Sequence, residues 1–152
     1  MKFIFETLNQ TRANALKSIE GFSEEQLAKI PEGFGNNILW NLGHMVASQQ
    51  ILCYKLAGIP MITPDEFVAL FQKGTSPKNW TDPVSLKEIK YYFEVTSEAF
   101  QKDYDKKIFE NYRAYKTSSG VALNTIDDAL VYNYGHENLH LGVVLTLRKL
   151  VS

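Results

Sequence analysis

The sequence predicts an all-α protein, a four-helix bundle with short extra helices. Four long segments repeat apolar residues at helical spacing, and almost no stretch alternates apolar and polar side chains as a half-buried strand would. Helix-start signals, in which Ser or Thr precedes an acidic or amide residue by three positions, recur between these segments. A chain of 152 residues suits one domain, residues 1–152, with a substantial core.

The first long helix is expected at residues 2–20, where apolar side chains form one stripe, and Gly21 ends it. Ser23 and Gln26 have the spacing of a capping box, in which each side chain binds the other residue's backbone N–H. This box predicts a short helix over residues 23–30.

The second long helix is expected at residues 36–56 and is apolar on nearly every side, which predicts burial on several faces. Gly58 and Pro60 end it. Thr63 precedes a glutamate by three positions, so we expect a capping box here too. This box would open a short helix over residues 63–72.

A loop rich in Gly, Ser, Pro and Asn is expected at residues 73–83. Ser85 then begins the third long helix, over residues 85–107. Residues 109–124 read as irregular, with room for one short extended piece. Thr125 begins the last long helix, which runs to near the C-terminus.

The composition narrows the classes of function. A net charge of −1 offers no basic stripe for phosphates, so we expect no nucleic-acid partner. We find neither an apolar run long enough to span a membrane nor a signal peptide, so no membrane partner is expected. The single cysteine, Cys53, forbids an internal disulfide and fits a reducing, cytoplasmic compartment.

The chain has only three histidines, and all can lie on inward-facing helix positions. His136 and His140 are one helical turn apart, about 40° around the axis, with Cβ atoms roughly 6 Å apart. His44 lies on a largely apolar face of the second long helix. Neutral imidazoles inside a bundle need partners for both ring nitrogens. A shared transition-metal ion would satisfy all three, so the sequence predicts a metal site.

Three glycines lie inside helices beside these histidines: Gly43, Gly135 and Gly142. Each costs about 0.5–1 kcal/mol relative to alanine in a helix interior. Residues that disfavour their own local structure, as glycine does in a helix, are often found near functional sites. The alternative is that the glycines simply permit close packing of helices.

Residues 136–140 also match H-E-x-x-H, the zincin protease motif, in which the glutamate is the base. Zincins take their third ligand downstream of the motif. Only 12 residues follow His140, and none is His, Glu or Asp. The third ligand must therefore come from upstream, and His44 is the only histidine left.

The chain resembles the DinB-like (YfiT-like) family of four-helix-bundle metalloenzymes over nearly its whole length. The resemblance lies in residues 38–44, Ile-Leu-Trp-Asn-Leu-Gly-His, and in His-Glu-x-x-His-x-Gly over residues 136–142. It implies an up-down-down-up bundle, commonly a homodimer, and His44, His136 and His140 as ligands of one divalent transition metal. Zinc or nickel is expected first, then iron or manganese. Val143 stands where many members of the family have glutamine. The substrate of any one member therefore cannot be assigned to this chain from the resemblance alone.

The resemblance implies a thiol-dependent S-transferase or a hydrolase acting on a small molecule, such as a low-molecular-weight thiol. Glu137 is the candidate catalytic residue, against the alternative of a packing glutamate. Trp40, Tyr132 and Asn133 are candidate substrate contacts, against ordinary packing. Two alternatives remain open: a non-catalytic, metal-stabilised binding or stress-related bundle protein, and a bundle without metal. Because ligand histidines must be deprotonated, we expect metal occupancy to fall below about pH 6.

Overall fold

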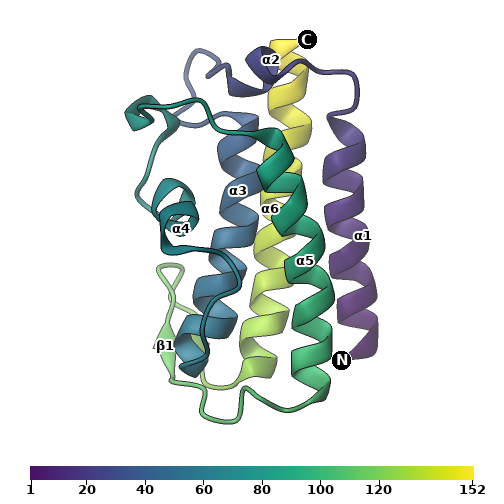
Figure 1. The fold of residues 1–152 in the computed structure, drawn as a ribbon, viewed down its shortest axis with the longest axis vertical. Coiled ribbons are helices and arrows are strands. Elements are labelled where there is room, and N and C mark those ends of the chain that lie inside the picture. The colour runs from purple at the N-terminus through teal and green to yellow at the C-terminus, as the bar shows by residue number, and fades with distance from the viewer.

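The computed structural model describes residues 1–152 and confirms the all-α bundle. Its four long helices are α1 (Lys2–Ser18), α3 (Ile38–Gln49), α5 (Leu86–Asp105) and α6 (Ile126–Val151). In Figure 1, α1 runs upward, α3 and α5 run downward, and α6 runs upward to a C-terminus at the top. The up-down-down-up order is therefore present, with a long crossover between α3 and α5.

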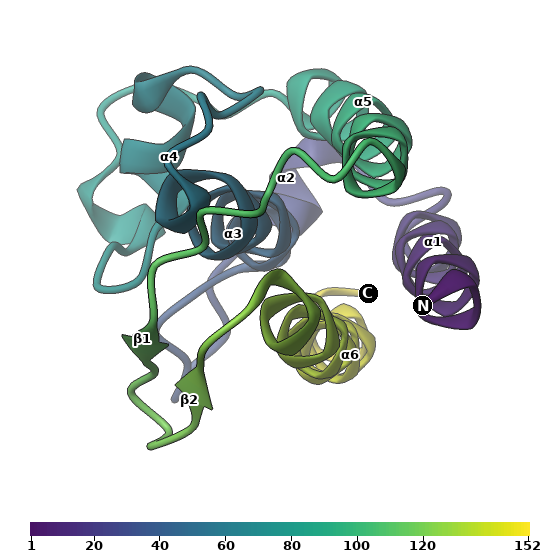
Figure 2. The ribbon, with the colours of Figure 1, turned by 90° about the horizontal axis from the view of Figure 1, so that it is seen from below.

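Figure 2 shows the bundle from one end, with α3 beside α6, α6 beside α1, and α5 beside α1 and α3. The core between the helices falls into two clusters. One contains α3 side chains such as Trp40 and Met45 together with the C-terminal part of α6. The other contains Phe5, Phe100 and Phe109 at the opposite end. α6 contributes to both clusters and packs against α1 and α3.

Short elements fill the connections. The helix α2 (Glu24–Ala28) follows α1, and the helix α4 (Asp65–Phe71) lies against α3 on the outside of the bundle (Figure 1). A single 3-10 turn, Pro77–Asn79, lies in the predicted loop before α5. Where one extended piece was predicted, the chain forms an antiparallel hairpin of β1 (Tyr115–Lys116) and β2 (Ala122–Leu123).

Three of the four predicted helix starts are confirmed. Ser23 and Thr125 form complete capping boxes, and the Ser85 hydroxyl accepts from the backbone N–H three residues on. The box predicted at Thr63 is absent, because Pro64 is extended and α4 begins one residue later. The buried Thr63 hydroxyl consequently has no hydrogen-bond partner.

The second long helix is not uniformly α-helical as predicted. After α3 it continues as a π-helical turn, Gln50–Tyr54, and then a 3-10 turn, Lys55–Ala57. The Gln50 side-chain oxygen accepts from the backbone N–H of Ile62, so this side chain holds the returning loop against the wide turn. Such π-bulges occur frequently at functional sites, and this one begins six residues after His44.

Two of the helical glycines have no packing role within the chain. A Cβ added at Gly135 or Gly142 would meet nothing within 4 Å, and both residues are exposed on α6. We therefore expect Gly135→Ala and Gly142→Ala each to raise the free energy of unfolding by about 0.5–1 kcal/mol, because alanine restricts the unfolded chain. Urea denaturation of each variant measures this. Lower stability would instead show that another molecule covers this face.

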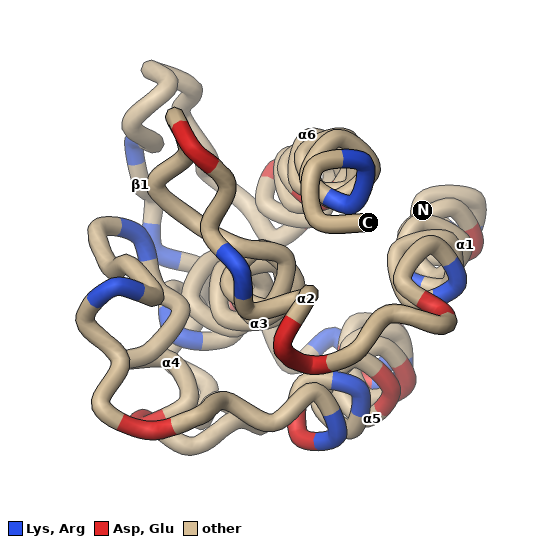
Figure 3. The backbone as a smooth tube through the Cα atoms, turned by 90° about the horizontal axis from the view of Figure 1, so that it is seen from above, with Lys and Arg blue, Asp and Glu red and all other residues tan.

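None of the helices combines the length and apolar character that crossing a membrane requires. Charged residues of both signs are interspersed along α5, as Figure 3 shows, whereas α3 contains none.

Candidate metal centre

The three histidines lie together between α3 and α6. Their candidate ligand nitrogens are all within 4.8 Å of one another. The ring centroid of His44 is 5.1 Å from that of His136 and 4.7 Å from that of His140, and the last two rings are 4.6 Å apart. His44 is buried, and the other two rings are partly buried. This group can hold a metal ion.

Contacts from three directions orient the His44 ring. Its Nδ1 donates to the backbone carbonyl of Phe71, at the end of α4, over 2.6 Å. The Ser48 hydroxyl lies 3.2 Å from Nε2, and the Trp40 ring stacks on the imidazole at 4.4 Å between centroids. Because Nδ1 carries the proton, Nε2 keeps its lone pair for a ligand or a weak hydrogen bond.

His140 is oriented in the same way by a side chain of α3. Its Nδ1 donates to Oδ1 of Asn41 over 2.8 Å. The amide group of Asn41 donates in turn to the backbone carbonyl of Asn37, also at 2.8 Å, which fixes the direction of Oδ1. Hydrogen bonds of this kind set the tautomer of metal-ligating histidines and raise their basicity. In His140 they leave Nε2 as the free nitrogen.

His136 has an unsatisfied nitrogen. Its Nδ1 is buried and has no hydrogen-bond partner, while the Tyr132 ring stacks near its imidazole with centroids 6.3 Å apart. A buried polar atom without a partner is costly, and such exceptions in native proteins call for an explanation, for example an ion. The residues present therefore fit a metal ion held by three neutral imidazoles.

All three imidazoles are neutral at physiological pH. Burial lowers the pKa of His44 to about 4, with the charge of His136 acting in the same direction against the hydrogen bond to Phe71. Burial, and then the charges of His136 and His44, lower the pKa of His140 to about 3. Burial also lowers the pKa of His136. Protons should therefore compete with a metal ion for these nitrogens only at a lower pH than the value of about 6 expected from the sequence.

A pH dependence of stability follows for the metal-free protein. Between about pH 6.5, the unfolded pKa of histidine, and the lower folded values, the unfolded chain binds more protons, so stability falls as pH falls. For His44, with its folded pKa of about 4, the loss at pH 5 is roughly 2 kcal/mol. Urea unfolding after chelation at pH 7, 6 and 5 measures it. A flat profile in this range would contradict the burial of neutral histidines.

The structure corrects the role predicted for Glu137. This side chain is fully buried, and its two carboxylate oxygens accept from Nη2 and Nε of Arg12 at 2.7 and 2.8 Å. The Asn133 amide also donates to it, at 2.9 Å. Glu137 therefore faces α1 and α5 instead of the histidines, so it is not placed to act as a base. Asn133, fully buried in the same cluster, is likewise not a substrate contact.

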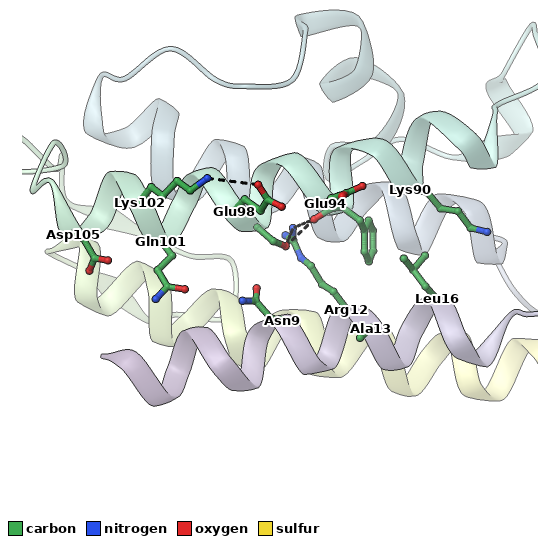
Figure 4. Close-up of a pocket in the computed structure, with 12 residues that line it drawn as sticks. Asn9, Arg12, Ala13, Leu16, Lys90, Glu94, Glu98, Gln101, Lys102 and Asp105 are labelled. Carbon is green, nitrogen blue, oxygen red and sulfur yellow. Dashed lines mark hydrogen bonds and ion pairs between the residues drawn. The ribbon is translucent and has the colours of Figure 1, made fainter.

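Arg12 connects three helices through this cluster. Besides Glu137 on α6, its Nη1 donates to Oγ1 of Thr96, Oγ of Ser97 and the carbonyl of Phe93 on α5. Figure 4 shows Arg12 extending from α1 toward α5 at the floor of a wide groove between the two helices. That groove, about 880 Å³, is lined by side chains of both charges and contains no histidine.

A second, smaller cavity of about 390 Å³ opens beside the histidines. It is lined by His44, Ser48, Ile51, Leu52, Lys73, Tyr115, Thr117, Ser118, Ser119, Tyr132, His136 and Leu139. Tyr132 therefore lies where a substrate contact was predicted. Trp40 does not line this cavity; it supports the His44 ring, and its indole N–H donates to Thr75.

Cys53 is fully buried in the core cluster that contains Phe5 and Phe100, and it does not line the cavity beside the histidines. Burial raises the pKa of this thiol far above its usual range, and the charge of Glu137 raises it further. The only cysteine of the chain is therefore protonated and enclosed, as expected for a residue that is neither a ligand nor a nucleophile.

Sequence reasoning missed two supports of the site. Asn41 stands within the motif that carries the family resemblance, three residues before His44, so its polar character in an apolar helix was a usable signal. The other support is the Phe71 carbonyl, a backbone group for which the side chains give no direct signal.

The fold and the site define a helical-bundle protein with a three-histidine cluster between two of its long helices. The family model of the DinB superfamily matches residues 7–144, and the chain belongs to this superfamily. A search of curated proteins finds no match.

Proposed function

We propose that this chain binds one divalent transition-metal ion through His44, His136 and His140 and uses it to activate a small thiol for transfer to an electrophile. The observation that carries the proposal is the convergence of three neutral imidazoles, two with Nδ1 held by fixed acceptors and one with a buried Nδ1 that lacks a partner. Zinc or nickel is the expected ion, with iron or manganese as the next candidates.

Three histidine ligands leave coordination positions open, which is typical of catalytic rather than structural sites. A divalent ion bound there lowers the pKa of a coordinated thiol or water. The residues of the chain supply orientation and a partly enclosed cavity. In the transfer, the thiol sulfur bonds to the electrophilic carbon, its proton is released, and the leaving group departs with the bonding electron pair.

The lining of the cavity favours thiol transfer over hydrolysis. No carboxylate lines it, and both oxygens of Glu137 are already bound by Arg12. The zincin arrangement, in which a glutamate takes a proton from metal-bound water, is therefore not available. A thiol needs less help, because its pKa already lies near neutrality and an adjacent metal lowers it.

Elemental analysis tests the metal. We expect one divalent ion per chain in the purified protein, and His44→Ala and His140→Ala should each lose it. The affinity loss should exceed the roughly 10–100-fold that follows removal of a supporting hydrogen bond. Cys53→Ala is the matched control and should keep the ion. A folded wild-type protein that takes up no divalent ion in dialysis would overturn the proposal.

Activity assays separate an enzyme from a binding protein. The metal-loaded protein is incubated with small thiols and an electrophile such as a halonitrobenzene, and the thioether product is measured. Turnover that disappears in His44→Ala supports the transferase. A metal-bound protein without turnover on thiols, esters or amides would instead support the non-catalytic alternative.

We further propose that the protein is a homodimer and acts on small molecules in the cytoplasm. The single chain leaves the large aromatic side chains of Phe3 and Tyr91 72% and 57% exposed, and a second copy can cover such surface. Sedimentation velocity at micromolar concentration tests the dimer, and a monomeric sedimentation coefficient at every concentration would contradict it.

A further inference from the structure

The cavity beside the histidines contains one charged side chain other than histidine. This is Lys73, which lies two residues beyond Phe71, the residue whose carbonyl orients His44. The short chain path from a fixed carbonyl keeps the lysine near the site. Although the chain has 17 acidic residues, none lines this cavity.

The electrostatics of the occupied site would be strongly positive. Three neutral imidazoles do not offset the charge of a divalent ion, and Lys73 adds one positive charge. The nearest buried carboxylate, that of Glu137, is neutralised by its two hydrogen bonds to Arg12. A partly enclosed positive cavity favours anions and raises their local concentration.

The other walls limit the size and shape of the ligand. A volume of about 390 Å³ lies at the small end of the range for ligand pockets, about 300–1,000 Å³. Ile51, Leu52 and Leu139 supply an apolar surface, while the hairpin loop supplies a row of hydroxyl groups at residues 117–119. The Tyr132 hydroxyl lies 3.1 Å from Ser119 and closes this polar wall.

We propose that the cavity binds low-molecular-weight thiols that carry a carboxylate, with Lys73 contacting the carboxylate while the sulfur reaches the metal site at His44 and His136. This inference rests on the proposed metal site and extends it by naming the charged group of the substrate and the residue that recognises it. Lys73 is a specificity-determining residue in this scheme. The hydroxyl row and the apolar wall receive the remainder of the molecule.

The test measures thiol binding to the cobalt(II)-substituted protein through the thiolate-to-cobalt absorption band. Three probes of similar size differ in charge: 3-mercaptopropionate is anionic, 2-mercaptoethanol neutral and cysteamine cationic. The readout is the affinity for 3-mercaptopropionate divided by the affinity for cysteamine. This ratio is compared between variants, so that differences between the thiol pKa values of the two probes cancel. We expect Lys73→Gln to lower this ratio by about 5-fold and Lys73→Glu by about 25-fold.

Lys78→Gln is the matched control, because Lys78 lies in the 3-10 turn of the same connection but does not line the cavity. It should leave the affinity ratio unchanged. For the wild-type protein, 0.5 M salt should reduce the preference for the anionic probe over the cationic one. If Lys73→Glu binds cobalt and the probes with the wild-type ratio, the inference about Lys73 is overturned while the metal site stands. Failure of the wild-type protein to bind cobalt would overturn both.

Discussion

Arg12→Met is expected to lower the free energy of unfolding by about 3–5 kcal/mol, because it leaves the Glu137 carboxylate buried without its partner. Arg12 is 3% exposed and Glu137 fully buried, so water cannot replace the lost hydrogen bonds. The substitution also removes the donors to α5, including the one to Thr96. Urea denaturation of the metal-free protein at pH 7 measures the loss.

The double variant Arg12→Met with Glu137→Leu is the control. Replacing a buried ion pair with apolar residues of similar volume is often neutral or stabilising, so we expect most of the lost stability to return. The free energy of unfolding of Arg12→Lys should lie between those of Arg12→Met and the wild type, since lysine keeps the charge but loses the bidentate geometry. If Arg12→Met is as stable as the wild type, the ion pair with Glu137 contributes nothing to the stability of the fold.

The position of this ion pair explains why the histidines face α3. Consecutive helical residues are turned by about 100°, so fixing Glu137 toward α1 and α5 turns its neighbour His136 toward the other side of α6. The helical offset of Glu137 from the two histidines was predictable from the sequence. Its partner was not, because Arg12 is 125 residues away along the chain. Without knowledge of that partner, Glu137 stayed a candidate catalytic residue beside the alternative of a packing glutamate.

The features that the sequence predicts best are local. The caps at Ser23, Ser85 and Thr125 depend on contacts within three residues, and all three form. The histidine pair on α6 follows from helical spacing, whereas its meeting with His44 was predicted from the inward-facing helix positions of a bundle and from the lack of any other histidine in the chain. The π-helical turn after α3 was not predictable, because a side chain twelve residues from its backbone partner helps to hold it.

Gly43→Ala is expected to lower both stability and metal affinity. An added Cβ would lie 2.3–2.5 Å from three ring atoms of Phe71, which is fully buried. The ring is also packed against Phe67 and Trp80, so it cannot move away freely. Overpacking of this kind typically costs about 1–3 kcal/mol. Chemical denaturation of the metal-free variant measures this part of the effect.

The metal affinity of Gly43→Ala distinguishes an effect on the histidine site from a general loss of packing. Moving Phe71 away from α3 displaces the carbonyl that holds Nδ1 of His44, and losing such a support costs about 10–100-fold in metal affinity. Gly142→Ala is the matched control, since its Cβ would meet nothing and the helix should gain stability. Metal affinity in each variant is measured by competition with a chromogenic chelator. Gly43→Ala with wild-type affinity would mean that the hydrogen bond to Phe71 does not prepare His44 for a metal.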